Sequence, residues 1–102
     1  MALFPAADIE RTVQELDMFR IDAQGSFFTA GETITALNIY PDFTNQPLVV
    51  FDVYVEGDPE CWFLDWAYEV AGDYDVKVEM LTASDTKEIT GTVTAITEAD
   101  EI

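Results

Sequence analysis

The sequence predicts an all-β domain, folded as an antiparallel sandwich of about seven short strands. The main observation is the segment 62–80, in which apolar and polar residues alternate with a period of two on both sides of Gly72. Side chains alternate across a strand, so this pattern indicates two half-buried strands joined at a tight corner. Turn residues such as Gly57-Asp58-Pro59 separate other segments of similar length and favour the same fold class.

Six strands are expected along the chain, separated by short turns and loops. Their ranges are 13–22, 33–40, 48–56, 62–70, 74–80 and 88–97, with loops at 41–47 and 82–87 and a turn at 30–32. The sandwich is therefore expected to span residues 13–97, preceded by an arm at 1–12 and followed by an acidic tail at 98–102.

Two alternatives remain open for the N-terminal arm. Pro5 and Asp8 suit the start of a short helix that places Ile9, Val13 and Leu16 on one face. The same segment equally suits an extended arm that leads into the first strand. The segment is too short for periodicity to decide between them.

The apolar rows of the expected strands define a core. Its expected members are Trp62, Leu64, Trp66, Tyr68, Val76, Val78, Val49, Phe51, Val53, Ile34, Ile89 and Val93. Trp62, Trp66 and Tyr68 could also form a platform for a sugar. Because they share a face with Leu64, core filling is the favoured interpretation.

Charge is the second strong signal. The 102 residues contain 21 Asp and Glu against 4 Lys and Arg, a formal net charge of −17. Direct binding to a phosphate backbone or to an anionic membrane needs a basic patch, so neither is expected. Molar salt would screen the self-repulsion, which favours a halophilic source. The alternative is an acidic protein whose charge only maintains solubility.

The segment from Tyr68 to Val78, Tyr-Glu-Val-Ala-Gly-Asp-Tyr-Asp-Val-Lys-Val, resembles the tyrosine corner of immunoglobulin-like domains, most closely the PKD-type module. Residues 25–36 resemble the segment that leads into the second strand of that family. The resemblance implies an immunoglobulin-like (PKD-like) sandwich in which Tyr74 returns its hydroxyl to the backbone across the corner and Gly72 supplies backbone freedom. One departure is residues 53–58, Val-Tyr-Val-Glu-Gly-Asp, where the family has Trp-Asp-Phe-Gly-Asp-Gly.

Such modules present surfaces and carry no chemistry, so the resemblance implies a non-enzymatic role. The segment Met1–Asp8 lacks the basic and apolar regions of a signal peptide. We therefore expect a structural protein of a tailed bacterial or archaeal virus, such as a capsid decoration, turret, neck or tail component. Its partners would be capsid or tail subunits, with several copies or a homo-oligomer in a virion assembled in the host cytoplasm. The alternatives are an acidic inhibitor that mimics nucleic acid and an adhesion or glycan-binding module.

No catalytic, cofactor or metal site is expected. The chain has no histidine, which removes the commonest general base, and its single cysteine, Cys61, has no positive neighbour in sequence. Zinc is not expected with these ligands. Calcium is not expected either, because the spacing of the carboxylates matches no EF-hand loop.

Five aromatic residues are the candidate interface. Tyr54 and Phe63 have the opposite parity to the apolar rows of their strands, which predicts exposed rings. Phe4, Phe27 and Phe28 lie in the arm and in a loop. Exposed aromatic side chains mark partner contacts more often than chance.

Overall fold

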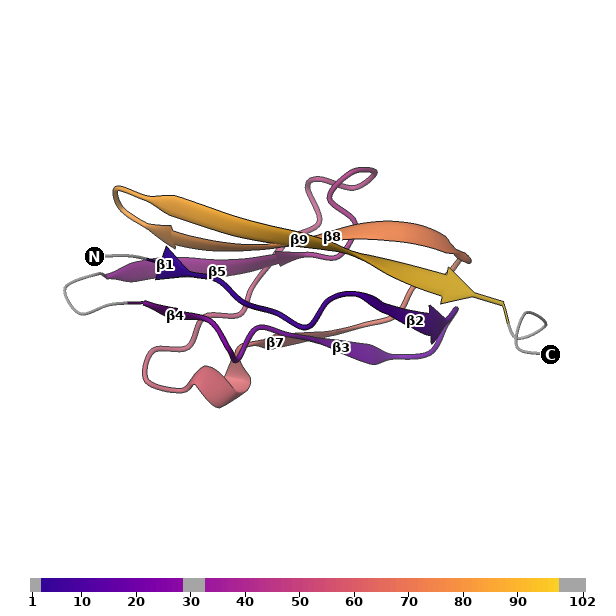
Figure 1. Ribbon diagram of the computed structural model, residues 1–102, viewed down its shortest axis with the longest axis horizontal. Helices are drawn as coiled ribbons and strands as arrows, with labels where there is room; N and C mark the ends of the chain where they lie inside the picture. The colour runs from indigo at the N-terminus through magenta and orange to yellow at the C-terminus, as the bar shows by residue number, and fades with distance from the viewer. Residues whose placement is uncertain (1–2, 29–32, 98–102) are drawn as a thin grey trace.

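The computed structural model describes residues 3–28 and 33–97, so the expected turn at 30–32 and tail at 98–102 lie outside the described residues (Figure 1). Within these ranges the chain forms nine strands and one short 3₁₀-helix. The elements are β1 (Leu3–Phe4), β2 (Arg11–Gln14), β3 (Phe19–Asp22), β4 (Phe27–Phe28), β5 (Ile34–Tyr40), β6 (Phe51–Asp52), η1 (Pro59–Cys61), β7 (Phe63–Trp66), β8 (Gly72–Thr82) and β9 (Thr86–Ile96).

The strands form a two-layer β-sandwich, which confirms the predicted fold class. One layer is a five-stranded sheet in the order β2-β9-β8-β5-β6. The other contains the pair β3-β7, and the chain continues from β3 into β4, which pairs with β1. Every pair is antiparallel except β2-β9, which is parallel. The body is elongated, at 51 × 25 × 16 Å.

The core lies between the two layers and follows the alternation of the strands. In β8, Val76, Val78 and Met80 are fully buried, while the residues between them face outward. The facing layer covers these residues, and buried residues on the neighbouring strands of the large sheet lie beside them. The buried core residues outside the expected list are Leu3, Ile9, Ile21, Ala23, Leu37, Ile39, Met80 and Ala95.

The N-terminal segment is extended and belongs to the sandwich. Leu3 and Ile9 are 4% and 5% exposed, so the core begins before residue 13. Ile9 packs against Gly91 of β9, where the missing side chain leaves room for it. β2 then pairs with the end of β9. Of the two alternatives for this segment, the extended one holds.

The expected strand at 13–22 is two strands in different layers. β2 belongs to the large sheet and β3 to the small one. Between them the chain turns at Leu16, which has a positive φ of 67° and donates its N–H to Tyr68 O at 2.7 Å. The alternation of apolar and polar residues could not reveal this crossover, because the apolar residues before and after Leu16 occupy the same alternating positions.

The expected strand at 48–56 shortens to β6. The Asp52 carboxylate accepts hydrogen bonds from the backbone N–H groups of Leu37 and Tyr54, at 3.1 and 3.0 Å. It therefore replaces part of the backbone hydrogen bonding between β5 and β6. Phe51 is 38% exposed rather than buried, because β6 is the edge strand of its sheet. Val49 and Val53 are half-buried.

Candidate functional site

Two tyrosines build the corner between β7 and β8. The Tyr74 hydroxyl donates to Val70 O across the corner, and its half-buried ring stacks on Tyr68 at 3.8 Å and 7° between planes. Tyr68 is buried and donates its hydroxyl to Pro41 O at 2.6 Å. Gly72 has φ +156°, in the region that favours glycine. The corner therefore joins the segment after β7, the start of β8 and the loop after β5.

A pocket of about 360 Å³ opens beside this corner. Its lining includes Asp42, Gln46, Trp66, Tyr68, Glu69 and Tyr74. The loop that carries the first two residues is fixed in place, since Phe43 N–H bonds to Asp75 O at 3.1 Å and Gln46 N–H to Asp42 O at 2.8 Å. The pocket thus joins a loop after β5 to the end of β7 and the start of β8.

Asp42 dominates the electrostatics of this pocket. The residue is 4% exposed, and its Oδ1 accepts from Asn45 Nδ2 at 3.3 Å. Burial raises the pKa of both Tyr68 and Tyr74, and the negative charge of Asp42 raises each pKa further. In the described part of the chain, no ion pair reaches Asp42. No sequence signal marked this residue, because its burial follows from how the loop folds over the corner.

Trp66 lines the same pocket and leaves one polar atom unused. Its half-buried ring contacts Phe51, with ring centroids 5.5 Å apart. The indole Nε1 is buried and has no hydrogen-bond partner within the described ranges. The other tryptophan, Trp62, is buried and donates its Nε1 hydrogen to Val55 O at 2.9 Å. Neither indole forms an open platform.

The remaining expected core residues lie between the layers or at their rim. Ile34, Val76, Val78 and Val93 are buried, and Leu64 and Ile89 are half-buried and packed against the core.

Two of the candidate interface residues form an exposed stack at one end of the sandwich. Phe4 and Phe27 face each other across β1 and β4, with ring centroids 4.4 Å apart and 12° between their planes. They are 41% and 55% exposed. Phe28 is half-buried and packs against the core.

Tyr54 and Phe63 differ from the expectation of exposed rings. The Tyr54 ring packs on Trp62 at 5.4 Å and is half-buried, because the shortened β6 lets the chain fold back over the core. Phe63 does lie on the outer face, but the Arg20 guanidinium covers its ring at 3.6 Å from the centroid. Neither offers a free aromatic face.

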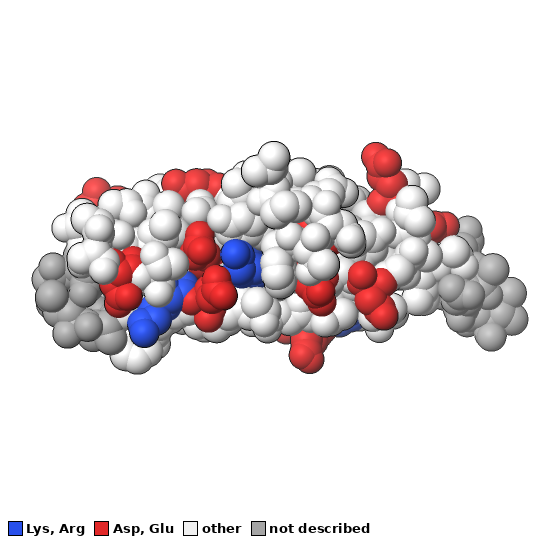
Figure 2. All heavy atoms as spheres, turned by 90° about the horizontal axis from the view of Figure 1, so that it is seen from above, with Lys and Arg blue, Asp and Glu red and all other residues white. Residues whose placement is uncertain are grey.

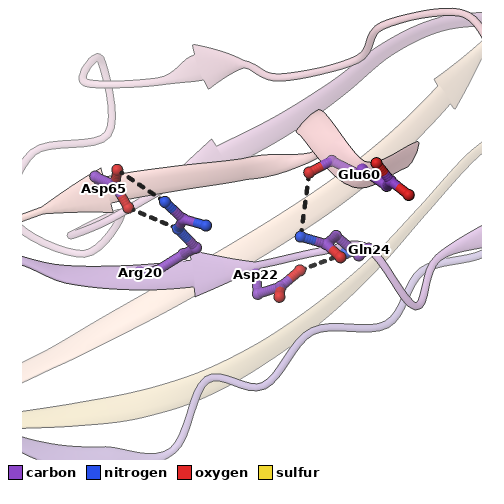
Figure 3. Close-up of polar contacts among 5 residues, drawn as sticks. All are labelled: Arg20, Asp22, Gln24, Glu60 and Asp65. Atoms are coloured by element: carbon purple, nitrogen blue, oxygen red, sulfur yellow. Dashed lines mark hydrogen bonds and ion pairs between the residues drawn. The ribbon is translucent and has the colours of Figure 1, made fainter. Parts of the chain in front are cut away.

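The outer face of β3 and β7 is a closed polar network (Figure 3). Arg20 pairs with Asp65 at 2.9 Å across the two strands. Beside this pair, Gln24 donates its N–H to Asp22 and its side-chain amide to Glu60 O, at 2.8 and 3.2 Å. These groups are hydrogen-bonded to one another, so few polar groups on this face remain available to a ligand.

The outer face of β8 carries carboxylates that do not form a continuous row. Lys77 lies between Asp75 and Glu79 in sequence and pairs with Glu79 and Glu88, at 4.0 and 3.6 Å. Asp73 accepts a hydrogen bond from Thr94 at 2.8 Å. Seen from above, acidic side chains are scattered over the molecule with basic groups among them (Figure 2). A phosphate-like row is therefore interrupted on this strand.

Cys61 lies exposed in η1 rather than in a strand. Its Sγ donates to Asp58 Oδ2 at 3.2 Å, and this hydrogen bond is the main cause that raises the pKa of the thiol. A raised pKa lowers the thiolate fraction and so the reactivity. Across residues 3–28 and 33–97, no three acidic or cysteine side chains gather to hold a metal ion. No helix in these ranges has the length and apolar character needed to cross a membrane.

The comparisons with known proteins support the fold alone. No protein-family model matches the chain, and no curated protein matches it in sequence. One similar solved structure comes from a study of carbohydrate-binding modules of the β-sandwich superfamily, with TM-score 0.66 and 13% identity over 94% of this chain and 34% of that one. Another is an endo-β-1,4-mannanase from Thermotoga petrophila, with TM-score 0.64 and 11% identity over 96% of this chain and 20% of that one. The chain therefore spans about a third and a fifth of these two proteins, and the matched portions are similar in fold to its β-sandwich.

Proposed function

We propose that this chain is a non-enzymatic β-sandwich module that acts by protein–protein contact. The observation that carries the proposal is the exposed stack of Phe4 and Phe27 on two short paired strands. Stacking and strand pairing hold both rings in fixed positions before any partner binds. Little conformational entropy is then lost on contact, which suits a docking surface.

The free energy available from this contact follows from the exposed areas of the two phenylalanine rings. A phenylalanine buries roughly 150–250 Å² in a core or interface, and these two rings remain about half exposed. Covering them would remove about 150–200 Å² of apolar surface from water. At about 25 cal/mol per Å², the transfer of this surface from water would contribute about 4 kcal/mol before the entropic cost of association is subtracted. These rings carry no polar group, so they suit an apolar protein surface better than a sugar.

We also propose that the module is of the immunoglobulin-like, PKD-like type. Three features support this: the first strands contact both layers, β2 runs parallel to the last strand β9, and Tyr74 closes a corner between the layers. By analogy with that family, the partners would be capsid or tail subunits of a tailed virus, and the chain would be present in several copies in the virion. This placement rests on the family resemblance and not on the fold comparisons.

The test measures whether the chain is a component of virus particles and whether the two phenylalanines hold it there. Mass spectrometry of purified particles should find the chain as a stoichiometric component, and Phe4→Ser/Phe27→Ser should lower its retention on particles at least tenfold. Phe51→Ser is a matched control, because that ring is also partly exposed but lies at a different edge. Absence from particles would refute the virion placement. Equal retention of the double variant and the wild type would refute the contact surface.

A second candidate function is glycan binding, which the carbohydrate-binding modules among the similar structures favour. The buried Trp62 and the half-buried Trp66 do not supply an open indole platform, so a sugar would have to use other residues. A glycan array probed with the intact chain distinguishes the two functions. Reproducible binding to one glycan class would favour this candidate over the first.

A further inference from the structure

The pocket beside the corner contains a buried carboxylate with no cation. Buried charges in proteins are normally paired, because removing a charge from water is costly. Asp42 is 4% exposed, and the partner that the described residues offer it is the neutral amide of Asn45. The second lining carboxylate, Glu69, adds negative charge to the same pocket. Asp42 therefore lies largely enclosed in the pocket without an ion-pair partner among the described residues.

The same chain shows how it binds its own cations. Arg20 pairs with a carboxylate and lies 3.6 Å from the centroid of an aromatic ring. Lys77 pairs with two carboxylates and lies 4.4 Å from the ring of Tyr40. Arg11 pairs with Asp8 and lies 5.9 Å from another ring. A cation between a carboxylate and an aromatic face is thus a repeated arrangement in this fold.

The corner pocket has a carboxylate and aromatic rings, and no Lys or Arg is among the described residues that line it. Asp42 supplies the carboxylate, and Trp66 and Tyr74 supply aromatic surface. The hydroxyl protons of Tyr68 and Tyr74 are already donated to backbone carbonyls, so in this arrangement their oxygens remain as acceptors. Apart from the Gln46 amide and the buried Trp66 Nε1–H, the polar side-chain groups that line the pocket are acceptors, and two of them are carboxylates, which favours a cation over an anion.

We propose that this pocket binds the guanidinium or ammonium group of an arginine or lysine side chain on a partner protein. Charge complementarity selects this occupant, because the chain has a net charge of −17 and attracts basic surfaces. The inference rests on the proposed protein-contact function. It concerns a site separate from the phenylalanine stack, so either surface can fail without the other.

The test titrates the intact ¹⁵N-labelled chain with N-acetyl-arginine amide and, separately, with N-acetyl-citrulline amide, its neutral isostere. We expect millimolar binding of the arginine probe, with shift changes at Asp42, Gln46 and the Trp66 Nε1–H signal. The citrulline probe should bind at least tenfold more weakly. Asp42→Asn should weaken the arginine probe by at least tenfold, whereas Glu60→Gln makes the same charge change at an exposed residue of η1 and should have little effect.

Each outcome decides the inference. Equal binding of the two probes, or shifts spread evenly over the acidic surface, would overturn it. Because both probes are compared on the wild type, the inference stays testable even if Asp42→Asn fails to fold. A β-1,4-linked disaccharide that shifts the same signals with unchanged affinity in Asp42→Asn would assign the pocket to glycans instead. Loss of particle association with intact arginine binding would refute only the proposed function.

Discussion

Gly91 tests whether the N-terminal segment is part of the folded core. A Cβ atom built at this residue would lie 2.8 Å from Ile9 Cγ2 and 2.9 Å from Ile9 Cβ. Real contacts between carbon atoms are longer, at about 3.5–4.0 Å. Gly91 is not among the residues with positive φ, so alanine would be resisted by packing and not by backbone conformation. Ile9 is 5% exposed and has little free space into which it could move.

The expected cost of Gly91→Ala follows from these contacts. Overpacking of a core costs about 1–3 kcal/mol. Alanine offsets roughly 0.5–1 kcal/mol of this, because glycine loses more backbone entropy in a strand. The net loss should be about 1–2 kcal/mol, which lowers the melting temperature by roughly 5–15 °C in a domain of this size.

A double-mutant cycle with Ile9→Ala provides the assay. Urea unfolding should give a loss of about 2–5 kcal/mol for Ile9→Ala alone. The double variant should lose at least about 1 kcal/mol less than the sum, because the smaller side chain makes room for the new methyl group. Gly25→Ala is the control, since its Cβ would meet Ala6 Cβ at an ordinary 3.6 Å. A neutral Gly91→Ala, or strict additivity, would falsify the packing of this segment on β9.

Four further predictions concern charge and hydrogen bonding. The melting temperature should rise between about 0.05 and about 3 M NaCl, because salt screens the repulsion of 17 net negative charges, and a flat curve by calorimetry would contradict this. Tyr68→Phe should cost about 1–3 kcal/mol in denaturant unfolding, because Pro41 O loses its donor, whereas Tyr40→Phe should cost less, because the half-buried Tyr40 hydroxyl donates to Glu79, which keeps Lys77 as a partner. Burial raises the pKa of folded Tyr68, so stability should be full below about pH 10 and fall above it, and Tyr68→Phe should reduce that fall in unfolding curves measured from pH 8 to 11. Arg20→Lys should lose most of the free energy of unfolding that Arg20→Gln loses, because only a planar guanidinium both pairs with Asp65 and stacks on Phe63; full retention by lysine would refute this.

The sequence predicted the long hairpin of β8 and β9 best. Each of these strands has 11 residues, and their inward residues alternate with polar ones along most of that length. Long strands average out local irregularity, so their periodicity is a reliable signal. Tyr74 and Gly72 were singled out by the resemblance to a tyrosine corner and not by the periodicity of the strands.

Periodicity could not predict the burial of residues whose environment depends on contacts distant in sequence. Ile9 is buried because Gly91 leaves space for it, and the two are far apart in the chain. Phe51 alternates correctly but lies in an edge strand, so its exposure depends on which strands are absent beside it. Asp42 is buried because the loop after β5 folds onto the corner. A single sequence contains no local signal for any of these three arrangements.

The two proposed contact surfaces differ in chemistry and in place, and this constrains how copies could assemble. The Phe4 and Phe27 stack belongs to the end of the sandwich that carries β1 and β4, whereas the corner between β7 and β8 lies toward the opposite end (Figure 1). One surface is apolar and the other acidic, so only the acidic one is unsuited to pairing with itself. A symmetric dimer through the pocket would bring carboxylates together, whereas two apolar stacks bury each other favourably. The proposed pocket therefore requires a basic partner, while the proposed stack suits an apolar partner or a second copy, and a module that used both would link neighbours of different chemistry at its two ends.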